Sequence, residues 1–156
     1  MKNKLTFKII ILISFFSLLF AFFLEYVLGH KPCNLCLMQR VPYLGSLILA
    51  SLALVLKKYD RICLILITLL FIFGGMVSFY HVGIEQGFFN ESIVCNLSGD
   101  QNILSTDSLL NQLEKASISC KNITFKFFGL SLATINTIFS SLISVKLIHI
   151  LYHAKN

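Results

Sequence analysis

The sequence predicts an all-α integral membrane protein, a four-helix transmembrane bundle with two extracytoplasmic cysteine-bearing loops. Two observations predict the bundle. Only 13% of the 156 residues are charged while 56% are hydrophobic, whereas a soluble domain normally contains about a quarter charged residues. The apolar residues also gather in four long runs, and a helix needs about 20 mainly apolar residues to cross the hydrocarbon core. Membrane spans therefore explain the low charge.

The four runs predict spans at about residues 8–26, 41–56, 62–80 and 127–146. The first run resembles a signal peptide, but it lacks a small-residue cleavage site and three more spans follow it, so we interpret it as a retained anchor. The second run is short for a span, unless Cys36 to Arg40 supply its outer end. The third run contains no charged residue, and the fourth ends near the C-terminus. We expect one membrane domain over residues 1–156.

The basic residues predict the orientation in the membrane. With both termini on one side, that side holds eight basic residues against one acidic residue, and the other side holds five against six. Short loops rich in Lys and Arg stay in the cytoplasm, so we expect both termini inside and outer loops at about residues 27–40 and 81–126. A nucleic-acid partner has little support, because the basic residues form no continuous patch.

Four of the five cysteines fall outside the cytoplasm under this topology, which an oxidising exterior favours. Cys33 and Cys36 precede the second span, while Cys95 and Cys120 lie in the second outer loop. Cys63 lies near the inner surface, about 27 Å of helix from the outer end, and is most simply a small buried hydrophobic residue. Four outer cysteines permit three pairings, and a Cys95–Cys120 bridge that stabilises its loop by ~3 kcal/mol would account for that pair alone.

The Cys-x-x-Cys spacing of Cys33 and Cys36 indicates a reactive or ligand-binding role more than a structural disulfide. A disulfide across two residues constrains little, so such pairs usually serve redox exchange or metal binding. Zinc sites commonly add a second pair or closely spaced histidines. The other outer candidates are irregularly spaced: His30, His81, Cys95 and Cys120. We therefore favour redox chemistry and expect no metal site.

The residues around Cys33 and Cys36 predict an environment that stabilises negative charge on the thiols. Pro32 suits the first turn of a helix, which places both thiols near a helix N-terminus, where negative charge is favoured and the pKa of a thiol falls. Arg40 follows Cys36 by four residues and is expected on the same face. A thiolate and a cation at the edge of the hydrocarbon core of the membrane are well placed to react with a lipid-soluble two-electron acceptor. The alternative for Arg40 is an interfacial arginine that reaches the headgroups. Pro42 predicts a kink or short break before the span proper.

A family resemblance is carried by residues 25–40, 80–87 and 128–136 and by the pair Cys95 and Cys120, and it covers essentially the whole chain. In these segments the sequence resembles the DsbB family of membrane thiol oxidases. It implies the bacterial inner membrane as location and a periplasmic DsbA-like thioredoxin-fold oxidase as partner. It also implies a membrane quinone, ubiquinone or menaquinone, as the electron acceptor.

The resemblance further implies a role for each outer cysteine. A thiolate of the partner attacks Cys95 and releases Cys120, which exchanges with Cys33 and so passes the electrons to the Cys33–Cys36 pair. Cys36 then faces the quinone, and Arg40 stabilises the negative charge that develops. Exchange with a soluble partner needs accessible sulfurs and quinone chemistry needs a pair at lipid depth, so two pairs of cysteines meet both needs.

His81 is expected at a depth similar to that of Arg40. It could contact the quinone or shuttle a proton, and an interfacial histidine without a catalytic part is the open alternative. Glu25 and Glu85 are expected near the same surface, where we favour structural pairing with Arg40 or His81.

Two other functions fit parts of the sequence. An enzyme of the vitamin K epoxide reductase type also has four membrane helices, a Cys-x-x-Cys pair and quinone chemistry, but its active pair is expected late in the chain. A non-enzymatic tetraspan protein with a disulfide-stapled outer loop would leave Arg40 and the kinked thiol turn without a reason. Re-oxidation of Cys33–Cys36 by quinone alone would exclude the non-enzymatic protein.

Overall fold

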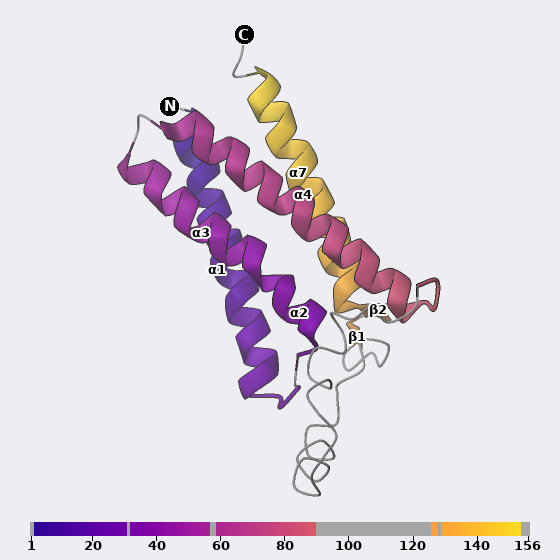
Figure 1. Ribbon diagram of the computed structural model, residues 1–156. Helices are drawn as coiled ribbons and strands as arrows, with labels where there is room; N and C mark the ends of the chain where they lie inside the picture. The colour runs from indigo at the N-terminus through magenta and orange to yellow at the C-terminus, as the bar shows by residue number, and fades with distance from the viewer. Residues whose placement is uncertain (1, 31, 57–58, 90–125, 128, 154–156) are drawn as a thin grey trace, which may run out of the picture.

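The computed structural model describes residues 2–30, 32–56, 59–89, 126–127 and 129–153. These residues form helices and one short hairpin (Figure 1). The elements are α1 (Lys2–Tyr26), α2 (Asn34–Met38), α3 (Arg40–Val55), α4 (Asp60–Glu85), β1 (Lys126–Phe127), β2 (Leu130–Ser131) and α7 (Leu132–His153).

Within the described residues, four helical stretches are long and apolar enough to cross a membrane, which confirms the predicted all-α membrane fold. They are Lys4–Tyr26, Asn34–Val55, Asp60–Glu85 and Leu132–His153. Figure 1 shows the start of α1, the end of α3, the start of α4 and the end of α7 at one end of the bundle. The short helix α2 and the hairpin lie at the opposite end, which we call the thiol end.

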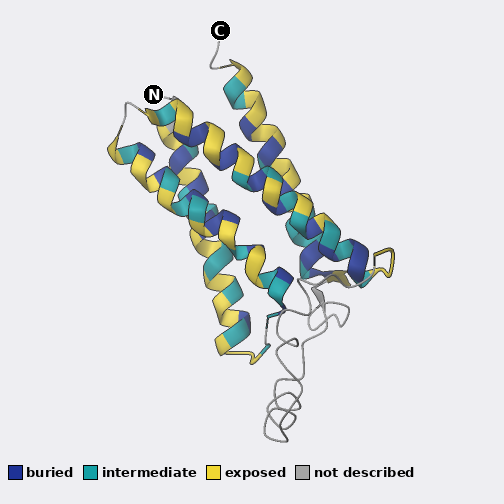
Figure 2. Cartoon of the chain, viewed as in Figure 1, coloured by how far each residue is buried: buried dark blue, intermediate teal, exposed yellow. Residues whose placement is uncertain are grey.

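The outside of the bundle is covered by large apolar side chains. Phe16, Met76 and Leu142 are among the most exposed, and Figure 2 shows the buried positions turned toward neighbouring helices. Helices in lipid gain no hydrophobic energy from one another, so they associate through close packing and hydrogen bonds. Gly74 illustrates the close packing, because a Cβ there would lie 3.0 Å from Cγ of Pro42.

The second span is built from two helices. Gln39 is the C-cap of α2 and the N-cap of α3, and it keeps helical dihedral angles of φ −70° and ψ −17°. The predicted break between the thiol turn and the span is confirmed at Gln39. Pro42 lies in the first turn of α3, where its missing N–H is not needed. The residues of α2 supply the length that residues 41–56 lack.

Helix α4 runs farther toward the thiol end than the predicted third span. It closes with Gly87 at a φ of 79°. The N–H of Gly87 donates to the carbonyl of Ile84 at 3.0 Å, and the N–H of Phe88 donates to the carbonyl of Gly83 at 2.8 Å. These two bonds form a Schellman motif. The extension keeps His81 inside the helix, where it is buried.

Helix α7 begins later than the predicted fourth span, because the hairpin precedes it. The strands pair antiparallel, with Lys126 opposite Ser131 and Phe127 opposite Leu130. Gly129 lies in the turn with a φ of 81°. The Oγ of Ser131 accepts a hydrogen bond from the N–H of Thr134 at 3.2 Å, as an N-cap side chain does. This start places Asn136 in the helix near the thiol end.

Candidate active site

Cys33 and Cys36 lie together where the second span begins. Cys33 is the N-cap of α2 and has an extended backbone, and the N–H of Cys36 donates to its Sγ at 3.3 Å. The two Sγ atoms are 2.6 Å apart. Sulfurs in a disulfide are about 2.05 Å apart, so a small movement converts this hydrogen-bonded thiol pair into a bond. The pair is arranged for reversible oxidation.

The two thiols differ in their surroundings. Cys33 is 8% exposed and packs with Leu35 and Ile84, while Cys36 is half-buried. The hydrogen bond with Cys36 and burial raise the pKa of Cys33 to about 12, although the hydrogen bond from His81 opposes the shift. This corrects the expectation that the helix N-terminus lowers the pKa at Cys33, because the shared hydrogen bond and burial outweigh it. Cys33 keeps its proton at neutral pH and can donate it to the sulfur of Cys36.

This difference predicts selective alkylation of the reduced protein. Iodoacetamide at pH 8 should modify Cys36 at least about tenfold faster than Cys33, because the thiolate is the reactive form and Cys33 is protonated and buried. The measurement is peptide mass spectrometry after brief labelling of a Cys95→Ser/Cys120→Ser variant. Denatured protein is the control, in which both thiols should react alike. Faster modification of Cys33 in the folded protein would contradict the assignment.

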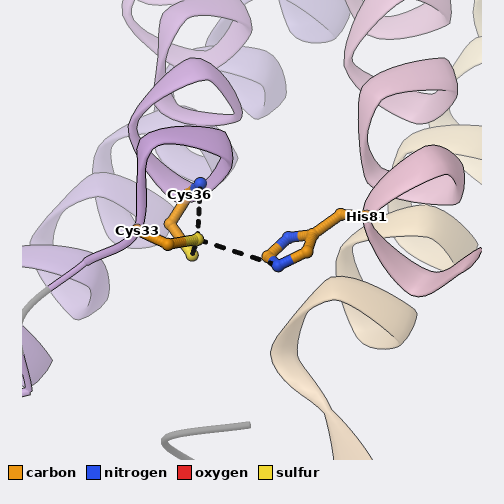
Figure 3. A group of neighbouring side chains, drawn as sticks. All are labelled: Cys33, Cys36 and His81. Carbon is orange, nitrogen blue, oxygen red and sulfur yellow. Dashed lines mark hydrogen bonds between the residues drawn. The ribbon is translucent and has the colours of Figure 1, made fainter. Parts of the chain in front are cut away.

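His81 reaches the thiol pair from α4. Its Nε2 lies 3.7 Å from the Sγ of Cys33, and Figure 3 shows the ring facing the sulfur from the neighbouring helix. The residue is only 4% exposed. Nε2 is also 3.7 Å from Oε1 of Glu85, one helical turn further on, so the expected pairing of His81 with Glu85 is present. Nδ1 lies 2.8 Å from Nε2 of Gln39.

Gln39 begins a hydrogen-bonded chain that runs into the bundle. Its Oε1 accepts from Nδ2 of Asn136 at 3.0 Å. The same Nδ2 donates to Oγ of Ser78 at 2.5 Å, and Oδ1 of Asn136 accepts from the hydroxyl of Tyr43 at 2.5 Å. A polar group in lipid is costly unless it is satisfied within the protein. These hydrogen bonds satisfy the buried polar groups. They also connect Gln39, which separates α2 from α3, to side chains of α3, α4 and α7.

Sequence reasoning did not assign a role to Gln39 or Asn136. The signal for Asn136 is an amide side chain within an apolar span, where polar residues usually have a partner or a function. Gln39 carries no comparable signal, because a glutamine at a membrane surface is ordinary. Its contact with His81 arises from the packing of the second span against α4.

Arg40 lies on the α1 side of the thiol turn. Its Nη1 donates to Oε2 of Glu25 at 2.5 Å, so the expected pairing of Arg40 with Glu25 is present. The guanidinium carbon lies 5.2 Å from the centroid of the Phe22 ring, within the range of a cation–π interaction. Cys36 and Arg40 lie on either side of Gln39, the residue that separates α2 from α3 and keeps helical dihedral angles.

The thiols and the imidazole also form a group of metal-ligand type. One ligand atom from each of Cys33, Cys36 and His81 lies within 4.8 Å of the others. Structural zinc sites normally have four protein ligands, and within the described part of the chain this group has three. We continue to favour redox chemistry for it.

The remaining cysteines lie elsewhere. Cys95 and Cys120 fall outside the described residues. Cys63 is buried in the apolar core near the start of α4, and the helical rise puts it roughly 27 Å from His81 on the same helix. Its position agrees with a packing role far from the thiol pair.

Comparison with known proteins places these residues in a family context. Residues 3–150 match the family model described as "Disulfide bond formation protein DsbB". The chain is 27% identical over 157 residues to uncharacterized protein RP370 of Rickettsia prowazekii, across 99% of this chain and 91% of the relative. It is 28% identical over 141 residues to disulfide bond formation protein B of Acinetobacter baylyi, across 86% and 82%. A third relative, disulfide bond formation protein B of Cupriavidus pinatubonensis, is 31% identical over 83 residues, across 53% and 52%.

Proposed function

Because this chain belongs to the DsbB family of disulfide bond formation proteins, we propose that it is a quinone-dependent protein thiol oxidase. Family membership and the four spans make it a multi-pass membrane oxidoreductase of disulfide formation. We propose that its partner is a periplasmic DsbA-like thioredoxin-fold oxidase and its acceptor the membrane quinone pool, ubiquinone or menaquinone. The observation that supports the proposal best is the thiol pair, 2.6 Å apart at the end of a membrane span.

The location follows from the same proposal. The bacterial inner membrane would hold the chain with both termini cytoplasmic and the thiol end toward the periplasm. The unequal distribution of basic residues supports this orientation. The protein partner would then meet Cys95 and Cys120 in the second outer loop, and the electrons would pass from Cys120 to Cys33 by thiol–disulfide exchange.

The surface beside Cys36 fits a lipid-soluble ring. Leu37, Met38 and Val41 are exposed on the outside of the bundle, where lipid would cover them. When bound there, a quinone supplies an acceptor for two electrons and two protons. Arg40 places a permanent positive charge beside these apolar side chains, and a charge placed in advance is worth most where water is excluded. Glu25 and Phe22 hold its guanidinium in position.

The two thiols contribute differently to the oxidation. Cys36 presents the more accessible sulfur, while Cys33 holds its proton and hydrogen-bonds to Cys36. Formation of the Cys33–Cys36 bond removes two electrons and two protons from the pair, which is the amount that a quinone accepts on full reduction. Nε2 of His81 lies 3.7 Å from Sγ of Cys33, and a nitrogen of the ring lies within 4.8 Å of Sγ of Cys36, so His81 serves the thiol pair first, and its contact with the quinone stays a prediction.

The test uses a reduced Cys95→Ser/Cys120→Ser variant, which retains Cys33, Cys36 and Cys63 as its thiols. Addition of a soluble quinone should remove two thiols per chain, because only Cys33 and Cys36 are close enough to form a bond. The matched control adds Cys36→Ser to this background and should lose no thiol to an intramolecular bond. If the thiols of the first variant survive excess quinone, the chain is not a quinone-dependent oxidase, and the non-enzymatic tetraspan protein becomes the better assignment.

A further inference from the structure

The hydrogen-bonded chain that ends at His81 has a direction set by its amides. Nδ2 of Asn136 donates to Oε1 of Gln39, so the group that Gln39 turns toward Nδ1 of His81 is its NH₂ group. An NH₂ group can only donate, and Nδ1 must therefore accept. A neutral imidazole that accepts at one nitrogen carries its proton on the other. The proton of His81 consequently sits on Nε2, which lies 3.7 Å from Sγ of Cys33 and also 3.7 Å from Oε1 of Glu85.

The other end of this hydrogen-bonded network has the same orientation. Oδ1 of Asn136 accepts from the hydroxyl of Tyr43, and the hydroxyl of Ser140 also approaches it at 3.4 Å, while Nδ2 of Asn136 faces Ser78 and Gln39. Gln39 is 9% exposed and Tyr43 is also buried, so these contacts replace those that water would make. The three hydroxyls can each donate or accept, so the orientation of the two amides sets the tautomer of His81.

We propose that Asn136 and Gln39 are positioning residues that fix His81 as an Nε2–H donor to the sulfur of Cys33. The inference rests on the proposed thiol-oxidase function and deepens it. When a mixed disulfide at Cys33 is opened, a thiolate bonds to the outer sulfur, the S–S bond breaks, and its electron pair moves to the Cys33 sulfur. A preorganised N–H donor stabilises the negative charge that arises there. His81 gains and loses no electrons in this step.

The same tautomer bears on the group of three metal-type ligands. A histidine that binds a metal through Nε2 must offer a lone pair there, and it usually donates its Nδ1 proton to a carboxylate or carbonyl. His81 has the opposite arrangement, because its Nδ1 receives a donor from Gln39. The hydrogen-bonded network therefore favours a sulfur acceptor over a metal ion at Nε2 of His81.

The tautomer is directly measurable by ¹⁵N NMR of histidine-labelled protein in detergent. The chain has four histidines, and the His81 signals are those missing from a His81→Gln variant. The parent should show His81 with the proton on Nε2, while Asn136→Leu and Gln39→Met should lose that preference. Ser144→Ala is the matched control, since Ser144 is also buried on α7 but donates to the carbonyl of Ser140. A parental His81 protonated on Nδ1 would overturn the proposal.

A second readout is the rate at which reduced glutathione opens the Cys33–Cys36 disulfide, measured without quinone in the Cys95→Ser/Cys120→Ser background. Loss of the donor should slow this opening about tenfold, because the Cys33 sulfur then leaves without an N–H donor to its developing charge. Asn136→Leu and Gln39→Met should both show it, and Ser144→Ala should not. Unchanged rates of opening in both folded variants would overturn the proposal. Failure of the parent to react with quinone would remove the proposed function but leave this result standing, so the two outcomes are distinguishable.

Discussion

Replacing Cys36 with serine should abolish electron transfer to quinone while leaving a mixed disulfide with the partner able to form at Cys95. Without Cys36 the second span has no intramolecular disulfide to offer, so electrons that enter at the outer loop have no way to leave. The rate of quinone reduction should fall to the uncatalysed rate. The measurement is steady-state quinone reduction by the reduced partner, together with trapping of the mixed disulfide on a non-reducing gel.

Cys95→Ser and Cys120→Ser are the matched variants, and they should show the reverse pattern. Electron entry from the partner should stop, while chemically reduced Cys33–Cys36 should still react with quinone. Cys63→Ser should behave like the parent, because Cys63 is buried at the other end of α4. If Cys36→Ser, Cys95→Ser and Cys120→Ser lose both half-reactions equally, the cysteines act on folding and the division of labour is wrong.

Arg40→Met should slow quinone reduction about a hundredfold and leave disulfide exchange at Cys95 unchanged. Methionine keeps much of the length but removes the charge, and loss of one preorganised charge-stabilising donor commonly costs ~3 kcal/mol. Arg40→Lys should retain part of the rate, because an ammonium keeps the charge but lacks the planar fork of a guanidinium. Steady-state quinone reduction by each variant is the measurement.

Two controls separate catalysis from packing at this position. Glu25 would lose its partner in Arg40→Met, so the Arg40→Met/Glu25→Gln double variant removes the unpaired carboxylate and should remain slow. Arg61→Met removes an exposed arginine at the opposite end of the bundle and should keep the parental rate. Quinone reduction by Arg40→Met at the parental rate would mean that Arg40 only anchors the segment at the membrane surface.

The four spans could be predicted from the sequence because lipid demands a long apolar helix at each crossing, whatever the packing. Their ends depend on local backbone geometry that composition does not report. The Schellman motif at Gly87 lengthens α4, and the capped start at Ser131 makes α7 begin later than predicted, although it also extends farther, to His153. The α2 turn brings residues before the apolar run into the second span, because a single residue with helical dihedral angles, Gln39, separates α2 from α3.

The candidate site divides in a similar way. Cys33, Cys36 and Arg40 could be identified because their chemistry is carried by short spacing within ten residues of sequence. The contacts of Gln39 could not, since Asn136 lies 97 positions away and His81 lies 42 away. Those contacts exist only when α7 packs against α4 and the second span is interrupted at one particular residue.

The interruption at Gln39 also limits how this part of the chain can change in length. Gln39 and Arg40 are adjacent, yet Gln39 contacts α4 and α7 while Arg40 contacts α1. One residue inserted or removed in a helix rotates every following side chain by ~100°. A residue inserted between Gln39 and Arg40 would therefore separate either the Gln39 amide from the His81 imidazole or the Arg40 guanidinium from Glu25. A substitution in this segment changes the contacts of one residue. An insertion or deletion must be compatible with the contacts to α1 and with those to α4 and α7 at the same time.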